Sequence, residues 1–386
     1  MKRPKLFNFS CISLFSVWVS LCSVVFSLWV QPLSGQKNPL AKVISEGGTA
    51  GEYQAFPDMC RLKNGEIVAV FYAGNSHVTQ RTDAYPQCGR ICMVRSTDEG
   101  RSWSQPVTLF DDTFDNRDPH ISQLRDGRLI CTFFSIYLIR GDATNYFLKY
   151  PQYLISTDNG KTWEKEPHAV EPDRKGWFCS SPMEQIGQRL YFPLYYTSDT
   201  GVYGGVVYSD NLGKSWSNPV PIGKEVPIQL PAETAIIRLK WGTLYAALRA
   251  EGAEPMHCAV SQTRGESWEP ARPLGFVGHA PSFTRLKNKT IVLTHRGFRK
   301  GADWSTGYTA ARFSYDEAQT WQGPYLVDDY VGAYPASLQL KDGSLLVIYY
   351  EEGTKSRVKV ARFALPENKS ESAPDSLPIP LKGLPL

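Results

Sequence analysis

Glu233, Tyr334, Arg249 and Arg296 are the residues of this 386-residue chain whose types and spacing best fit a chemical role. Glu233 and Tyr334 each lie nine residues before the turn of a strand–turn–strand segment, and each arginine lies seven residues after such a turn. Two converging guanidinium groups can hold a carboxylate bidentately. A tyrosine has a pKa of about 10 in solution, so it needs a base such as Glu233 to become a nucleophile. The set indicates covalent catalysis on a ligand with a carboxylate.

These positions belong to a repeat of two apolar strands joined by a tight turn. Alternate side chains of a strand face the same side, so equivalent positions of several inner strands can converge on one axis. The turns are centred on Gly65, Gly127, Gly242, Lys289 and Gly343. The segments are Phe56–Tyr72, Asp118–Phe134, Glu233–Arg249, Ala280–Arg296 and Tyr334–Tyr350, with a weaker copy at Ser180–Tyr196. The sequence thus contains six units.

A second repeat, Ser-x-Asp-x-Gly-x-Ser/Thr-Trp, follows the first five units. Its copies begin at Ser96, Ser156, Ser209, Ser261 and Ser314, and the last three each replace one Asp or Gly. An Asp that accepts backbone N–H groups, followed by a conformationally free Gly, is typical of a hairpin turn. We interpret these Asp-boxes as braces of the fold, since the ligand spacing of a calcium loop is absent.

Together the two repeats predict the architecture. Each unit supplies two strands and a box-bearing hairpin of two more, which is the four-stranded blade of a propeller. The prediction is an all-β fold, a six-bladed β-propeller with Asp-box hairpin turns, over residues 40–365. The sixth unit has no box, and we expect the strand-like segment Ala41–Glu46 to complete its sheet and close the ring.

Five Asp-boxes on a six-blade repeat resemble the sialidase (neuraminidase) superfamily over about residues 40–365. The resemblance implies that Tyr334 is a nucleophile activated by Glu233, and that Arg249 binds a substrate carboxylate. It implies Arg296 as a further carboxylate ligand, with Arg299 as the alternative. In this family the acid/base Asp lies in the loop after the second strand of the first blade, where Asp83 is the one acidic residue here.

The first blade departs from the family pattern. The family opens this blade with Arg-Ile-Pro, whose Arg completes a carboxylate-binding triad, whereas this chain has Ala55-Phe56-Pro57. The second blade carries Arg117 in the equivalent register. Either Arg117 rebuilds the clamp from a neighbouring blade, or the ligand is not a standard sialic acid.

Two functions follow from this resemblance. The leading hypothesis is a retaining exo-glycosidase that hydrolyses terminal sialic acid or a related acidic sugar from glycans, with Asp83 as proton donor. The alternative, motivated by Ala55, is a carbohydrate-binding propeller of the same fold without catalysis. Neither hypothesis requires a metal or another cofactor.

The two ends of the chain are expected to lie outside the propeller. Lys2, Arg3 and Lys5 precede an apolar run over residues 7–30, so residues 1–35 read as a signal peptide or an uncleaved N-terminal anchor. The protein is therefore expected to be secreted or periplasmic, with membrane contact only through that segment. Residues 366–386 are rich in Pro, Ser and charged residues and are expected to be disordered.

Charge and cysteine content exclude further classes. The net charge of +4 falls to +1 without the three basic residues of the N-terminal segment, which gives no electrostatic basis for binding nucleic acid. The cysteines after that segment are too widely spaced for a zinc site. The sequence leaves open whether Cys88 pairs with Cys60 or Cys92, or whether all stay reduced.

Overall fold

The structure of the protein is a computed structural model that describes residues 41–83, 86–138, 146–198, 201–230, 232–353 and 355–366. The expected N-terminal signal or anchor, and the expected disordered tail apart from Pro366, lie outside these residues. Within them, no helix is long and apolar enough to span a bilayer. The described part consists of β-strands, loops and three short 3-10 turns.

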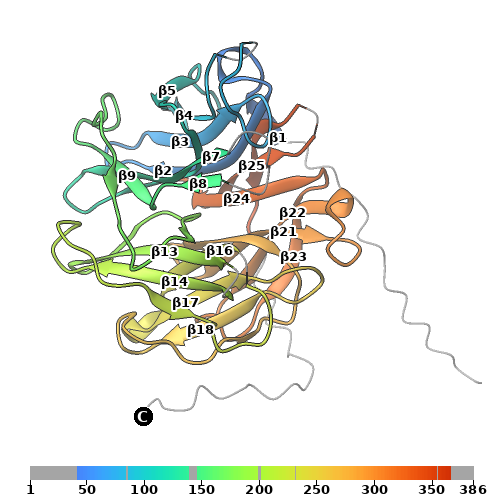
Figure 1. Cartoon of the computed structure of the whole chain (residues 1–386). Helices are drawn as coiled ribbons and strands as arrows, with labels where there is room; N and C mark the ends of the chain where they lie inside the picture. Colours follow the sequence, from blue (N-terminus) through green and yellow to red (C-terminus); the bar gives the residue numbers. More distant parts are fainter. Residues whose placement is uncertain are drawn as a thin grey trace, which may run out of the picture. The chain divides into compact units, whose positions relative to one another are not determined.

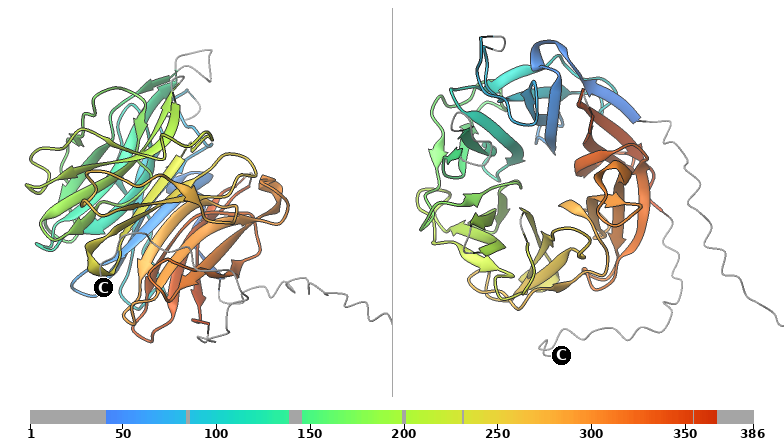
Figure 2. Two further views of the ribbon diagram at one scale, coloured as in Figure 1. Left: turned by 90° about the horizontal axis from the view of Figure 1, so that it is seen from below. Right: turned by 45° about the vertical axis from the view of Figure 1, so that its right-hand side comes forward.

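Six antiparallel sheets stand around a common axis, as Figure 1 and the right-hand view of Figure 2 show. This confirms the predicted six-bladed propeller. From the axis outwards, the first blade consists of β2 (Tyr53–Arg61), β3 (Ile67–Gly74), β4 (Arg90–Ser96) and β5 (Val107–Phe110), and the second of β6 (Asp115–Gln123), β7 (Leu129–Leu138), β9 (Gln152–Ser156) and β10 (His168–Ala169), with β8 (Tyr146–Leu148) beside β7. The third blade consists of β11 (Trp177–Phe178) and β12 (Glu184–Ile186), β13 (Arg189–Ser198), β14 (Gly201–Ser209) and β15 (Val220–Ile222), and the fourth of β16 (Ala232–Arg238), β17 (Leu244–Arg249), β18 (His257–Ser261) and β19 (Arg272–Pro273). The fifth blade consists of β20 (His279–Arg285), β21 (Ile291–Phe298), β22 (Gly307–Ser314) and β23 (Gln322–Asp328), and the sixth of β24 (Gly332–Gln339), β25 (Leu345–Glu351), β26 (Arg357–Phe363) and β1 (Ala41–Ser45).

The ring is closed by its first strand. β1 pairs antiparallel with β26, with Ala41 opposite Ala361 and Lys42 opposite Val360. The N-terminal strand thus becomes the outer strand of the last blade, as the sequence predicts. This pairing covers an edge of β26 that would otherwise expose unpaired backbone groups.

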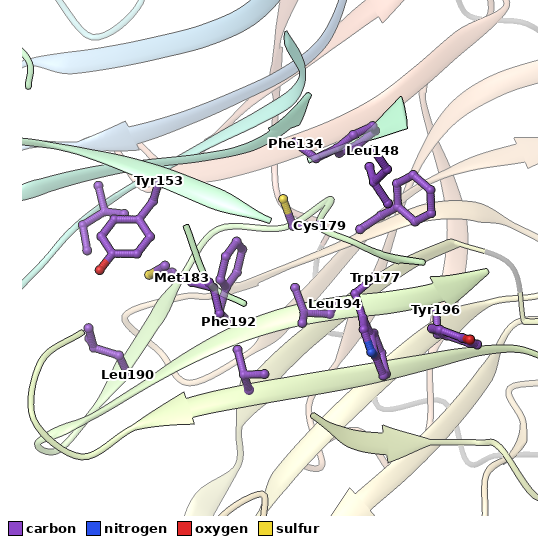
Figure 3. Packing of buried hydrophobic residues seen from close by; sticks show 14 of the residues in the cluster. Phe134, Leu148, Tyr153, Trp177, Cys179, Met183, Leu190, Phe192, Leu194 and Tyr196 are labelled. Atoms are coloured by element: carbon purple, nitrogen blue, oxygen red, sulfur yellow. The ribbon is translucent and has the colours of Figure 1, made fainter. Parts of the chain in front are cut away.

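Apolar side chains fill the spaces between neighbouring blades. The largest cluster lies between the second and third blades and contains the buried side chains of Phe134, Trp177, Phe192 and Leu194 (Figure 3). Burial of apolar area at about 25 cal/mol per Å² makes such contacts the main force that holds the blades together. The six cysteines of the described residues are free thiols, and all except Cys60 are buried.

The Asp-boxes form the predicted hairpin turns. In the first box, Asp98 Oδ1 accepts the Ser102 backbone N–H at 2.9 Å, and Ser96 Oγ accepts the Gly100 N–H at 2.9 Å. Gly100 has a φ of 77°, and a Cβ added there would lie 2.7 Å from Leu346 of the sixth blade. The box therefore braces its own hairpin and also packs against the preceding blade.

Five inner strands share a bulge that the sequence repeat did not predict. The pairing register shifts at the same point of β2, β6, β16, β20 and β24. The residue at each bulge has a positive φ: Phe56 52°, Asp118 48°, Glu233 20°, Ala280 51° and Tyr334 47°. Left-handed conformations cost non-glycine residues about 1–3 kcal/mol and concentrate at functional sites. Bulges re-aim side chains, and here they lie at the same level of the axis in five of the six blades.

Candidate active site

Three predicted side chains meet at the end of the axis where the bulges lie. They are Tyr334 from β24, Glu233 from β16 and Arg249 from β17. The Tyr334 hydroxyl donates a hydrogen bond to Glu233 Oε1. Arg249 Nη1 donates to the same carboxylate, at 2.9 Å to Oε1 and 3.2 Å to Oε2. The Ala280 backbone N–H lies 3.3 Å from Oε2. Glu233 is therefore fixed between the phenol and the guanidinium, as the shared registers predict.

The phenol of Tyr334 is held in its neutral form. Burial raises its pKa well above 10, and the negative charges of Glu233 and Asp118 add to the shift, whereas Arg249 opposes it. For Arg249, burial lowers the pKa, but the charge and hydrogen bond of Glu233 and the charges of Tyr334 and Glu251 together outweigh burial, so the pKa is raised overall. The site thus holds a protonated phenol beside a carboxylate that can accept its proton.

Arg296 lies beside this group and is almost completely buried, with 1% of its surface exposed. Its Nε donates to the Gly332 carbonyl at 2.7 Å, and its Nη2 lies 3.4 Å from Glu352 Oε2. The indole of Trp304 covers Arg296 at 4.1 Å and Arg249 at 5.6 Å from the ring centre. One aromatic ring therefore spans the two arginines that the sequence assigns to a carboxylate clamp.

Arg117 is linked to Tyr334 through the aromatic ring of Phe56. Its guanidinium packs over Phe56 at 5.1 Å, and the Phe56 ring is 4.9 Å from that of Tyr334. Its charge is paired with Asp115 Oδ2 at 3.1 Å, and its Nη2 lies 3.2 Å from His77 Nε2. Arg117 thus reaches the site through Phe56, and protein groups already occupy part of its hydrogen-bonding capacity.

Asp83 is not brought into this group. It is exposed in the loop between β3 and β4, and no hydrogen bond or ion pair of the described residues joins it to Tyr334, Glu233 or an arginine. The same loop does send His77 toward the site, where its Nδ1 lies 3.0 Å from the Tyr53 hydroxyl. The structure therefore gives the acid/base role of Asp83 no geometric support.

Asp118 is a further candidate, to which the sequence analysis gave no role although it shares the register of Glu233 and Tyr334. Only 5% of its surface is exposed, Ser180 Oγ lies 3.4 Å from its Oδ2, and its Oδ1 has no hydrogen-bond partner among the described residues. Burial raises its pKa to about 6 despite Arg117 and His120, and Glu233 raises it further. The register alone could have identified this carboxyl, but its pKa depends on burial.

Several polar atoms at this end of the axis are buried and unpaired within the described residues. They are Asp118 Oδ1, Arg249 Nε, Arg296 Nη1 and both ring nitrogens of His279. Burial and the charges of Arg249 and Arg296 lower the pKa of His279 to about 2, so its ring is neutral. Buried polar groups in folded proteins are nearly all hydrogen-bonded. A cluster of exceptions is the pattern expected where a polar ligand binds. No cluster of His, Cys, Asp and Glu in the described ranges suits a metal ion.

Comparison with known protein families supports the sialidase resemblance. Residues 192–370 match the BNR repeat-like domain family. A sialidase of Clostridium perfringens is 24% identical over 211 residues, which cover 48% of this chain and 53% of that protein. The chain thus spans about half the length of this curated relative.

Solved structures share the fold at low identity. A Dyadobacter fermentans protein of unknown function has a TM-score of 0.73 and 22% identity, and covers 86% of this chain and 99% of its own. The intramolecular trans-sialidase of Ruminococcus gnavus, solved with oseltamivir carboxylate, has a TM-score of 0.66 and 15% identity over 83% and 97%. An alpha-L-arabinanase of Penicillium chrysogenum has a TM-score of 0.60 and 15% identity over 84% and 98%. Because enzymes with different substrates share this fold, the reaction must be argued from the site.

Proposed function

We propose that this chain, which resembles the sialidase-like superfamily of BNR-repeat propellers, is a retaining exo-glycosidase for terminal sialic acid or a related acidic sugar. The observation that carries the proposal is the hydrogen-bonded set of Tyr334, Glu233 and Arg249. A substrate with a carboxylate on its anomeric carbon would repel an anionic nucleophile. A neutral phenol avoids that repulsion, and sialidases are the known glycosidases with a Tyr nucleophile.

The first step is displacement of the leaving group. Glu233 accepts the phenol proton while the Tyr334 oxygen forms a bond to the anomeric carbon. The bond from that carbon to the leaving oxygen breaks with its electron pair, and a general acid protonates the oxygen. In the second step water, deprotonated by the same acid/base group, attacks the anomeric carbon. The bond from that carbon to the Tyr334 oxygen breaks with its electron pair, and Glu233 returns its proton to the phenol. Two displacements retain the anomeric configuration.

Asp118 is the better-placed candidate for the general acid. It lies in the ring of bulge residues with Tyr334 and Glu233, and its pKa of about 6 keeps part of it protonated near neutral pH. Asp83, which the family resemblance implies, is exposed and makes no described contact with the site. Asp83 would have to approach when substrate binds. If Asp118 is the general acid, Asp118→Asn should lose activity and Asp83→Asn should not. If Asp83 is the general acid, the reverse is expected.

The arginines are proposed to hold the carboxylate of the sugar. Arg249 and Arg296 each have a buried N–H with no partner among the residues that the structure describes, and Trp304 spans them. Arg117 is proposed as the third member of the clamp, in place of the arginine that Ala55 removes. Because Asp115 already neutralises Arg117, its contribution is expected to be smaller than that of the other two.

A panel of methylumbelliferyl glycosides tests the proposal. Sialosides, other ulosonides and uronides should be compared with neutral sugars, for the wild type and for Tyr334→Phe. We expect release of methylumbelliferone from an acidic glycoside and a loss of at least 10³-fold in Tyr334→Phe, which lacks the nucleophile. Turnover of neutral glycosides alone would refute the proposal.

A carbohydrate-binding propeller without catalysis is the second candidate. It is favoured by Ala55 and by the pairing of Arg117, Arg249 and Arg296 with carboxylates of the protein itself. It predicts saturable binding of acidic glycans without any product. Under this function Tyr334→Phe would leave the affinity nearly unchanged, so the same panel and a binding assay separate the two functions.

A further inference from the structure

A concavity lies at the end of the inner strands opposite to Tyr334 and Glu233. Glu233 stands at the start of β16, and this concavity begins at its other end, about 20 Å away at 3.3 Å per residue. It has a volume of about 680 Å³, within the range of ligand-binding sites. Turns of four neighbouring blades line it, with residues Arg125, Gln185, Arg238, Trp241, Lys289 and Glu317 among them.

Trp241 occupies a position where four other turns have Asn or Asp. The inner turns of five blades have the pattern Leu-Lys/Arg-x-Gly/Lys, and in the four blades besides that of Trp241 x is Asn64, Asp126, Asn288 or Asp342. Each of those side chains accepts a backbone N–H two residues on, at 3.0–3.1 Å. Trp241 cannot make this bond.

The tryptophan is also strained and exposed. It has a φ of 68°, which none of the four Asn and Asp residues shares, and 78% of its surface is exposed. A left-handed conformation is strained for a bulky residue. An exposed indole at a strained position, in place of a residue that stabilises the turn, contributes nothing evident to folding. This points to a role in binding.

The turn that presents Trp241 is firmly held. The Lys240 backbone N–H donates to Glu317 Oε2 at 2.6 Å, and Glu317 also binds Arg285 at 2.8 and 2.9 Å. The Leu239 N–H donates to the Thr243 carbonyl at 2.8 Å. The backbone that carries the indole is therefore fixed, and Lys240 Nζ lies 4.6 Å from the ring centre.

The charge of the concavity is positive. Arg125, Arg238 and Lys289 are exposed, and their side chains form no hydrogen bond or ion pair among the described residues. Of the two lining acids, Glu317 is paired with Arg285. Burial, with help from Asp58, raises the pKa of Glu184 to about 7, so it is largely uncharged below neutral pH. The unpaired cations thus face a cavity with little negative charge to balance them.

We propose that this concavity is a second carbohydrate site, which binds an acidic oligosaccharide by stacking a sugar ring on Trp241 and pairing its carboxylate or sulfate groups with Arg125, Arg238 and Lys289. An exposed, rigid aromatic ring offers a flat apolar face to the C–H groups of a pyranose. Arginine and lysine select anions. A nucleic acid strand would offer rings and charges too. The choice of a saccharide rests on the function proposed above, under which the protein meets acidic glycans.

Trp241→Asn is the decisive variant because Asn restores the residue type of the other turns. Binding should be measured by titration calorimetry on the full chain carrying Tyr334→Phe, so that no ligand is consumed. The probes are a heparin tetrasaccharide, an oligogalacturonate, neutral lactose and a single-stranded RNA oligonucleotide. Trp241→Asn is expected to weaken binding of an acidic oligosaccharide at least tenfold, with equal or higher Tm. Lys289→Ala should weaken it and flatten its salt dependence, whereas the control Lys341→Ala, in the equivalent turn of the sixth blade, should not.

Each outcome either supports or overturns the second site. Unchanged affinity in Trp241→Asn, equal binding of lactose, or binding of RNA alone overturns it. A failure of the second-site proposal can be told apart from a failure of the proposed glycosidase activity. Trp241→Asn in the otherwise wild-type chain should turn over small acidic glycosides at the normal rate, since Trp241 lies far from Tyr334.

Discussion

Asp118 combines burial, a position in the ring of bulge residues and a shifted pKa, which together are the properties of a proton donor. As a general acid it must be protonated, so wild-type turnover should fall as the pH rises through about 6. We expect Asp118→Asn to lose 10²–10⁴-fold in kcat for natural glycosides and to lose this pH dependence. The matched variant Asp83→Asn should stay near the wild type. The reverse result would assign the role to Asp83.

The raised pKa of Asp118 also predicts that the free energy of unfolding changes with pH. The folded pKa of Asp118 lies above its ordinary value of 3.8, so between about pH 4 and 6 the folded state holds a proton that the unfolded state has lost. Stability should therefore fall as the pH rises through this window, by at most about 3 kcal/mol. Asp118→Asn should remove this part of the fall and leave the part that comes from the raised pKa of Glu184, as urea unfolding at pH 4, 5, 6 and 7 would reveal. A parallel pH dependence in the variant would contradict the shift.

At the scale of single residues, the sequence predicted which side chains converge where a repeat defined the positions. Tyr334, Glu233 and Arg249 were found because nine and seven residues from a turn are fixed distances along two strands. His77 and Trp304 were not found, because they reach the site from loops with no repeat. Asp83 was assigned by family pattern alone, and its exposed position shows how little a loop residue's place follows from sequence.

At the scale of elements, the Asp-box is both a turn and a contact between blades. A Cβ at Gly100 would collide with Leu346 of the neighbouring blade, and at Gly127 of an inner turn it would meet nothing within 4 Å. Both glycines have a positive φ, 77° and 99°. Alanine substitutions at these two glycines therefore separate the cost of backbone strain from the cost of altered packing between blades.

Gly100→Ala should destabilise the protein more than Gly127→Ala. We expect about 1 kcal/mol for Gly127→Ala from strain and 2–4 kcal/mol in total, roughly, for Gly100→Ala, because the overpacked contact adds to it. Urea unfolding measures both, and turnover of the folded fraction should not change. Equal losses would mean that the box does not brace the neighbouring blade.

The strand repeats predicted the blades but not the bulges. Period-2 alternation identifies which residues share a register, yet a bulge depends on how two strands pair. Proline follows four of the five bulge residues, Phe56, Asp118, Ala280 and Tyr334. Proline lacks the N–H that a regular ladder needs, so this Pro was a readable signal of irregular pairing.

At the scale of the whole molecule, one strand from the start of the propeller closes the ring. Removal of residues 1–46 would delete β1 and bare the edge of β26. We expect Tm to fall by several degrees and the protein to self-associate through the open edge. Thermal unfolding and size-exclusion chromatography test this, with a chain that lacks only residues 1–35 as the control. An unchanged Tm would show that the ring is stable without its closure.

The most direct test of the central claim is to trap the covalent intermediate. A fluorinated acidic glycosyl fluoride, whose ring fluorine slows the second displacement, should be incubated with the protein and the adduct mapped by peptide mass spectrometry. We predict one sugar per chain, attached to Tyr334 and absent in Tyr334→Phe. Attachment to another residue, or turnover of the parent glycoside with no adduct on Tyr334, would contradict the account.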